Sequence, residues 1–193
     1  GTLTVTNREA KYEITVKANS ATATYDGKEH EAVGVETYEF TVEGNSYTVS
    51  GLSTEDPKQK DAGSYTNNIT GIPVVTDKEG NVVTSEFEVK TENGSLEIGK
   101  AAVTLKSATL SKKYDGNALV NGDTALEIES GFAEGEGATY NFTGSQTVVG
   151  SSANAFSYEL NGNTNIDNYA ISKQEGTLTV TNREAKYEIT VKA

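Results

Sequence analysis

The sequence predicts an all-β protein: two tandem modules of the Ig-like or β-sandwich type in an elongated rod. Apolar residues alternate with polar ones, as in Leu3 with Val5 and Ile14 with Val16, which is the period of a half-buried strand. Turn-forming Gly, Asn and Asp residues separate these short runs, as they do in sandwiches and small barrels. No long window of the chain has the period of an amphipathic helix.

A hairpin is expected between Tyr38 and Val49. An alternating run meets Gly44 and Asn45, and a second alternating run follows, so the sequence predicts two antiparallel strands joined by a Gly-Asn turn. Residues 77–81 (Asp-Lys-Glu-Gly-Asn) predict another turn, between two pairs of valines.

Asn93 and Gly94 form the strongest short hairpin signal, an Asn-Gly pair between two alternating runs. Residues 87–98, which contain this pair, align without gaps on residues 169–180, where Gly176 holds the place of Gly94. We therefore expect the same hairpin near the end of each module.

A β-grasp-like fold with one short helix in each module is the alternative. It requires helices that the apolar pattern does not provide. The divergent segment 54–62 is the place where a short helix would fit.

Two levels of repetition define the domain organisation. Residues 1–18 and 176–193 are identical (GTLTVTNREAKYEITVKA), so the chain repeats with a period of 175 residues. Within one period, the Tyr-Asp-Gly triplet at residues 25–27 recurs 89 residues later, at 114–116. The sequence therefore predicts two modules of one plan, and we expect the chain to be one period of a longer array.

Module one is expected to span residues 12–99 and module two residues 100–181. Residues 1–11 then correspond to the terminal strand and junction of a preceding repeat, and residues 182–193 to the junction and first strand of a following one. An isolated strand is unstable in water, so we expect these ends to pair with neighbouring molecules, as in a crystal, or to fold back on a sheet edge. The joints between modules are short and not Gly/Ser-rich, which favours a rod over a flexible string.

The composition excludes several classes of function. The chain has no Cys and one His, so disulfides, zinc ribbons and thiolate sites are ruled out. A net charge of −12 argues against nucleic acid as a partner, and no run is long and apolar enough for a membrane span. No arrangement of residues predicts a catalytic site, a metal site or a cofactor, and we expect no enzymatic activity.

Module two combines three short motifs. Lys113-Tyr114-Asp115-Gly116 opens it, Asn168-Tyr169-Ala170-Ile171 follows, and Gly176-Thr177-Leu178-Thr179-Val180 closes it. The module thereby resembles the MBG/YDG-type tandem repeat modules of bacterial, Gram-positive cell-surface adhesin-like proteins. Module one resembles them more loosely, because Ser85-Glu86-Phe87-Glu88-Val89 stands where the Asn-Tyr-x-Ile motif is expected.

The resemblance implies a structural stalk or spacer repeat of a secreted or wall-anchored protein, outside the bacterial cell, that projects a distal binding region. It implies no catalytic residue, and its partners would be the neighbouring identical repeats of the parent chain. The alternative is a repeated adhesive module that binds a host glycan or protein by avidity. That alternative predicts an exposed aromatic cluster or a pocket shared by both modules.

The two triplets, Tyr25-Asp26-Gly27 and Tyr114-Asp115-Gly116, are interpreted as structural turns. Asp-Gly predicts a tight turn with a positive φ at the glycine, and the tyrosine is expected to pack its ring while its hydroxyl reaches the backbone.

Two further hypotheses concern bonds within the modules. The amide-rich loop 161–167 and the acidic segment 134–137 are weak candidates for calcium, which prefers oxygen ligands. Lys17, Lys106 and Asn168 have the residue types of an internal isopeptide bond, although a lysine in an alternating strand normally faces solvent.

The remaining ionisable candidates are His30 and two carboxylate pairs, Glu134 with Glu136 and Glu55 with Asp56. His30 lies between two glutamates and is expected at the surface. Paired carboxylates are the groups that glycoside hydrolysis uses, but nothing in the sequence places these in a cleft.

Overall fold

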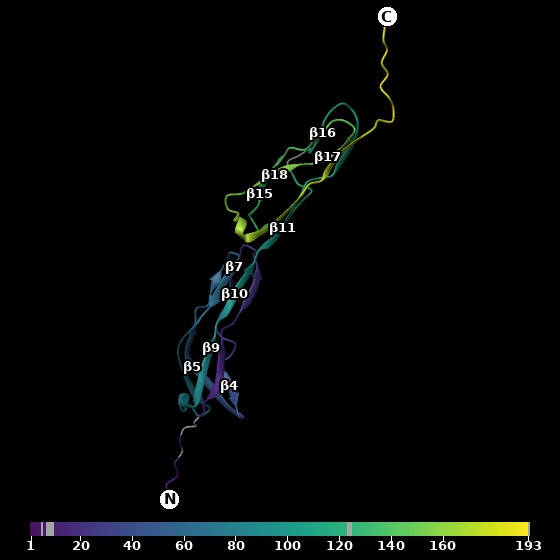
Figure 1. Ribbon diagram of the computed structural model, residues 1–193. Helices are drawn as coiled ribbons and strands as arrows, with labels where there is room; N and C mark the ends of the chain where they lie inside the picture. Colours follow the sequence, from purple (N-terminus) through teal and green to yellow (C-terminus); the bar gives the residue numbers. More distant parts are fainter. Residues whose placement is uncertain (5, 7–9, 123–124, 193) are drawn as a thin grey trace. The chain divides into compact units, whose positions relative to one another are not determined.

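The computed structural model describes residues 1–4, 6, 10–122 and 125–192, and it confirms an all-β chain of the sandwich type (Figure 1). The chain divides into two compact units, Gly1–Gly99 and Lys100–Ala193. Each unit is built from short strands arranged in several small sheets of two or three strands.

The elements of the first unit are β1 (Tyr12–Lys17), β2 (Ala21–Thr24), β3 (His30–Glu31), β4 (Glu39–Val42), β5 (Asn45–Thr54), β6 (Lys58–Gln59), β7 (Gly63–Asn67), β8 (Ile69–Asp77), the 3₁₀ turn η1 (Thr84–Glu86), β9 (Phe87–Glu92) and β10 (Gly94–Gly99). Those of the second are β11 (Ala101–Lys106), β12 (Leu110–Lys113), β13 (Leu119–Val120), β14 (Ile128–Ser130), β15 (Ala138–Phe142), β16 (Ser145–Gln146), β17 (Gly150–Ala153), β18 (Phe156–Leu160), the 3₁₀ turn η2 (Ile166–Asn168), β19 (Tyr169–Gln174) and β20 (Thr177–Thr181).

The β-grasp-like alternative is wrong. The helical elements in the described part of the chain are the single 3₁₀ turns η1 and η2, and residues 54–62 contain the short strand β6 instead of a helix. The Thr-, Gly- and Asn-rich sequence favours strands and turns, so no amphipathic helix face is available to cover a sheet.

The first and last strands of each unit run parallel and side by side. β1 pairs with β9 from Tyr12 opposite Phe87 to Lys17 opposite Glu92, and β2 pairs with β10 in the same sense. In the second unit β11 pairs with β19 and β12 with β20, again parallel. The two units therefore share one arrangement of their terminal strands.

Antiparallel pairs complete the sheets. In the first unit β7 lies on the free side of β10, β5 lies between β4 and β8, and β3 pairs with β6. In the second unit β14 lies beside β11, β17 beside β20, β15 beside β18, and β13 beside β16.

The expected hairpin between Tyr38 and Val49 is confirmed, with a shifted turn. Val42 lies opposite Asn45, so the loop is Glu43-Gly44 and not Gly44-Asn45. Both loop residues have positive φ, 49° and 81°, as a two-residue turn that matches the strand twist requires. The turn at residues 77–81 is also confirmed, because Asp77 accepts hydrogen bonds from the backbone of Glu79 and Asn81.

The expected hairpins at Asn93-Gly94 and Gly176 are wrong. β9 and β10 continue along one line in Figure 1 and do not pair with each other: β9 pairs with β1, whereas β10 pairs with β2 and β7. β19 and β20 behave in the same way. The alternating pattern is identical for a strand that turns back and for one that continues into the next sheet, so the local signal could not separate the two.

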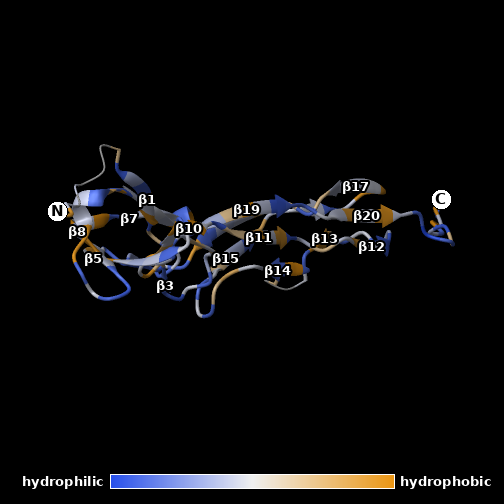
Figure 2. Cartoon of the chain, turned by 90° about the horizontal axis from the view of Figure 1, so that it is seen from below, coloured by the Kyte–Doolittle hydropathy of each residue, from blue (hydrophilic) through white to orange (hydrophobic). Residues whose placement is uncertain are grey.

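Apolar side chains from the first, last and middle strands form the core of each unit. In the first unit Ile14 and Val16 of β1 pack with Val49, Val75 and Phe87. The largest buried apolar residues of the second unit are Val103, Leu105, Phe156, Tyr169, Leu178 and Val180. Figure 2 shows apolar residues on β20, which is followed by a hydrophilic segment that leads to the C-terminus.

The described residues of the terminal segments do not pair with a sheet edge. No strand occurs among the described residues before Tyr12 or after Thr181. Leu3 is 100% exposed and Val191 88%, whereas Val5 lies outside the described residues. The identical residues Leu178 and Val16 are fully buried, so the same sequence forms a strand only where its own module surrounds it.

Candidate functional site

Several ionisable side chains lie in surface ion pairs. The Nζ atoms of Lys17 and Lys90 lie 2.9 and 3.0 Å from the carboxylates of Glu92 and Glu13, across the β1–β9 ladder. Over the described ranges, no three His, Cys, Asp or Glu side chains gather closely enough to hold a metal ion. In the same residues, no helix has the length and apolarity that crossing a membrane requires.

The first Tyr-Asp-Gly triplet forms a turn that also holds the single histidine. Asp26 Oδ1 accepts a hydrogen bond from Lys28 N and lies 2.9 Å from His30 Nε2, and Gly27 has a φ of 80°. The backbone N–H of Lys28, and then His30, lower the pKa of Asp26. His30 is thus a partner of the turn, a contact that its neighbouring glutamates did not indicate.

The second triplet has the same geometry with a different partner. Asp115 Oδ1 accepts hydrogen bonds from Lys112 Nζ (2.8 Å) and Asn117 N (2.9 Å), and Gly116 has a φ of 84°. The Lys112 ammonium, and then the Asn117 N–H, lower the pKa of Asp115. The backbone N–H of each tyrosine donates a hydrogen bond to the last strand of its unit. Tyr25 N donates to Gly99 O, and Tyr114 N donates to Thr181 O.

Asn168 ends η2 and Tyr169 begins β19, and both are buried. The Tyr169 hydroxyl donates to Glu136 Oε2 (2.8 Å) and accepts from Ala133 N (3.0 Å). Lys17 and Lys106, the lysines of the isopeptide hypothesis, have side chains 49% and 32% exposed, and each pairs with a glutamate. Their Nζ atoms therefore face carboxylates at the surface instead of a buried asparagine.

The two weak calcium candidates, segments 161–167 and 134–137, lie against each other. Asn163 Nδ2 donates to Gly135 O (2.8 Å), and Thr164 Oγ1 accepts from Gly137 N (2.9 Å). Asn165 Oδ1 caps η2 by accepting from Asp167 N. These amide and hydroxyl groups fasten one loop to the other.

A tightly constrained position in each unit is the crossover, where both parallel strands pass together from one sheet to the next. In the first unit β1 ends and β2 begins beside Gly94. A Cβ on Gly94 would lie 2.7 Å from Ala18 O and still closer to Asn19 O, below any real contact distance. Neither Gly94 nor Gly176 has a positive φ, so these glycines are required for space and not for a turn.

The second unit repeats the crossover at Gly176. A Cβ there would lie 2.5 Å from Ser107 O and closer to Ala108 O. The buried Ser107 hydroxyl donates to Asn154 O (2.6 Å) and accepts from Gly176 N (2.9 Å). Ala18 holds the place of Ser107 in the first unit, 89 residues earlier.

A fully buried asparagine fastens each crossover. Asn67 Nδ2 donates to Asn19 O (3.1 Å), and Asn67 Oδ1 accepts from Asp56 N (3.1 Å). Asn154 Nδ2 donates to Ala108 O (2.9 Å) and to Asn121 Oδ1 (2.7 Å). Because Asn19 and Ala108 are equivalent positions, the two asparagines perform the same task.

Sequence reasoning missed Asn67, Asn154 and Ser107. A signal was present: Gly-Ser-x-x-Asn occurs at residues 63–67 and again at 150–154. Its offset of 87 residues differs from the 89 and 82 that align the terminal strands, so a search at one fixed offset does not detect it.

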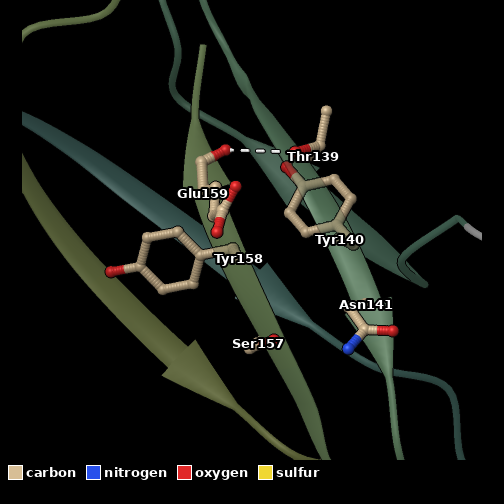
Figure 3. Close-up of a pocket in the computed structure, with 6 residues that line it drawn as sticks. All are labelled: Thr139, Tyr140, Asn141, Ser157, Tyr158 and Glu159. Atoms are coloured by element: carbon tan, nitrogen blue, oxygen red, sulfur yellow. Dashed lines mark hydrogen bonds between the residues drawn. The ribbon is translucent and has the colours of Figure 1, made fainter.

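Shallow hollows lie beside two strand pairs. The hollow in Figure 3 has a volume of about 210 Å³ and is lined by Tyr140, Tyr158 and Glu159 among others, between β15 and β18. Burial, with the nearby Glu129 carboxylate, raises the pKa of Tyr140. The volume is below the range of roughly 300–1,000 Å³ that is typical of ligand pockets.

A hollow in the first unit lies on β4 and β5 and includes Phe40 and Tyr47. This hollow lies on two strands that follow each other in the chain, whereas β16 and β17 separate β15 from β18 in the sequence. The Tyr47 ring packs inward, 4.7 Å from that of Phe87. These two hollows therefore do not form one pocket shared by both modules.

No protein-family model, curated protein or solved structure matches the chain. The likeness to MBG/YDG-type modules rests on the short motifs alone.

Proposed function

We propose that the chain is a structural stalk or spacer repeat of a secreted or wall-anchored bacterial surface protein, located outside the cell, that projects a distal binding region. The exact repetition of residues 1–18 at 176–193 and the motifs of the resemblance support this proposal. So does the net charge of −12, because like charges on successive modules oppose their collapse and keep a long β array soluble.

The observation that carries the proposal is the parallel pairing of the first and last strands in each unit. A stalk module is loaded through its two ends. When force pulls the N-terminal end of β1 away from the C-terminal end of β10, the β1–β9 and β2–β10 ladders are loaded in shear, along the direction of their strands. Six register pairs of one ladder and four of the other then bear the load together instead of opening one at a time.

The second unit has the same arrangement, with six register pairs between β11 and β19 and four between β12 and β20. The unit boundary adds little slack, since Lys100 alone separates β10 from β11. We propose that force therefore passes from the last strand of one module to the first strand of the next.

Single-molecule force spectroscopy tests this function. The chain has no native Cys, so cysteine handles can be placed freely. Handles at residues 11 and 100 load the parallel ladders, whereas handles at Glu39 and Thr48, register partners at one end of the β4–β5 hairpin, open antiparallel pairs in sequence. We expect the end-to-end geometry to require a several-fold higher force in the same module.

Equal forces in the two geometries would contradict a load-bearing role and would leave the parallel pairing without a mechanical function. We do not propose the adhesive alternative, because its central expectation, one receptor surface present in both modules, has no counterpart in the hollows described above.

A further inference from the structure

One six-residue sequence, Tyr-Glu-Ile-Thr-Val-Lys, occupies two environments in this chain. At residues 12–17 it is strand β1, and Ile14 and Val16 are 6% and 0% exposed. At residues 187–192 it lies outside any strand, and Ile189 and Val191 are 86% and 88% exposed. The chain thus carries a second, uncovered copy of one of its own core strands.

The place that β1 occupies is at the edge of its sheet. Among the described residues, β1 pairs with β9 along its whole length, and near its end the other side carries the hydrogen bond from Glu36 N to Lys17 O and the bridge of Ala18 with Val35. A strand at such an edge can leave and be replaced with few backbone bonds broken on its other side and without threading the chain through a loop.

Every group that holds β1 in place has a counterpart in the second copy. Tyr12 donates to Glu43 Oε2 (2.7 Å), Ile14 and Val16 enter the core, and Lys17 pairs with Glu92. The identical sequence supplies these groups as Tyr187, Ile189, Val191 and Lys192. A copy seated beside β9 would therefore make the same contacts in the same register.

We propose that a second copy of this chain is a binding partner, and that residues 187–192 of one copy replace β1 beside β9 of another. The exchange joins the end of one chain to the first unit of the next, in a heterologous, head-to-tail manner that leaves a free segment at each end of the assembly. The inference rests on the repeated strand and its burial, and it does not depend on the proposed function.

Concentration decides which strand is seated. The resident strand is attached to its module and has an effective concentration of order millimolar, as short flexible connections give. The donor strand of a second copy makes the same contacts but is only as concentrated as the protein. The unmodified chain at micromolar concentration is therefore expected to keep its own strand, and disabling the resident strand reveals the exchange.

The experiment uses the full chain with one pair of substitutions placed in either copy of the strand. Ile14→Asp with Val16→Asp disables the resident strand, and Ile189→Asp with Val191→Asp disables the donor. The quadruple variant disables both. Sedimentation velocity from about 1 to 100 µM, well below the effective concentration of a tethered strand, reports assembly, and far-UV circular dichroism reports β structure.

We expect the resident-strand variant to assemble with rising concentration and to regain its β signal as it does so. The donor-strand variant should sediment as a monomer, and the quadruple variant should show neither assembly nor recovery. An equimolar mixture of the quadruple variant and the unmodified chain should form hetero-dimers, because the quadruple variant offers an empty place beside β9 and the unmodified chain supplies an intact donor.

Three outcomes would overturn the proposal. The resident-strand variant could remain a folded monomer at all concentrations, which would show replacement within one chain. It could remain a monomer with the circular dichroism of the quadruple variant, which would show no replacement. It could assemble to the same extent as the quadruple variant, which would show aggregation unrelated to the donor strand.

Discussion

Alanine at Gly94 or Gly176 is expected to destabilise its unit by about 4 kcal/mol or more, which is the exceptional range for a single substitution. The added Cβ would meet the backbone oxygens of the neighbouring crossover, Ala18 and Asn19 for Gly94, and Ser107 and Ala108 for Gly176. Backbone cannot rotate away as a side chain can, so the parallel strands must separate. A domain with a typical stability of about 5–15 kcal/mol would lose a large part of it.

Urea unfolding of the full chain, followed by circular dichroism, measures this effect, and the two units give internal comparison. Gly162→Ala is the matched control, because a Cβ at Gly162 meets open space, and we expect a change within about 0.5 kcal/mol. Gly94→Asn distinguishes the two reasons for a glycine at this position. Asparagine tolerates the left-handed conformation of a turn, but its Cβ would meet the backbone oxygens of the crossover. A Gly94→Asn variant as stable as the parent would contradict the close approach.

Removal of the buried amide at Asn67 or Asn154 is expected to cost about 2–4 kcal/mol, since each substitution removes two hydrogen bonds of a fully buried group. Asn67→Ala removes the hydrogen bonds of the side chain with Asn19 O and Asp56 N, and Asn154→Ala removes those with Ala108 O and Asn121 Oδ1. Replacing Asn by Ala also leaves a small cavity, which adds to the loss.

Denaturant midpoints and amide hydrogen exchange measure the result. Exchange should accelerate first in the strands that meet at the affected crossover, β2 and β10 for Asn67, and β12 and β20 for Asn154. Asn45→Ala serves as the control, because Asn45 is exposed beside the β4–β5 loop and should change stability by less than about 0.5 kcal/mol. Equal effects at Asn45 and Asn67 would show that the buried amide does not fasten the crossover.

The all-β class was predictable because an alternating period requires only local information. Ile14 and Val16 are buried in β1 as their spacing indicates, and the Tyr38–Val49 hairpin forms where its turn residues lie. In the hairpin, Glu43 and Gly44 adopt the positive φ values, so the loop lies one residue before the expected Gly-Asn pair. Residue type alone does not fix which two residues adopt positive φ.

Strand partners were not predictable from the same pattern. Asn93-Gly94 has the composition of a hairpin turn, yet here Gly94 provides space for the backbone of Asn19, a residue 75 positions away. The crossover site was missed for the same reason, because Asn67 and Asn154 act on backbone oxygens distant in sequence. A sequence shows residue types and periods, whereas this site depends on which strands meet.

The central claim is that the first and last strands of a module lie side by side in parallel, and a pair of cysteines tests it most directly. Thr15 lies opposite Lys90 in the β1–β9 ladder, whereas a hairpin at Asn93-Gly94 would place Lys90 opposite Glu97. Neighbouring strands bring Cα atoms within the roughly 4.4–6.8 Å that a disulfide spans.

Because the chain contains no other Cys, any disulfide in these variants joins the introduced pair. We expect mild oxidation of the folded protein to close the disulfide quantitatively in Thr15→Cys with Lys90→Cys, and not in Lys90→Cys with Glu97→Cys. Closure of the second pair together with failure of the first would contradict the parallel arrangement, and with it the load-bearing role proposed for the module.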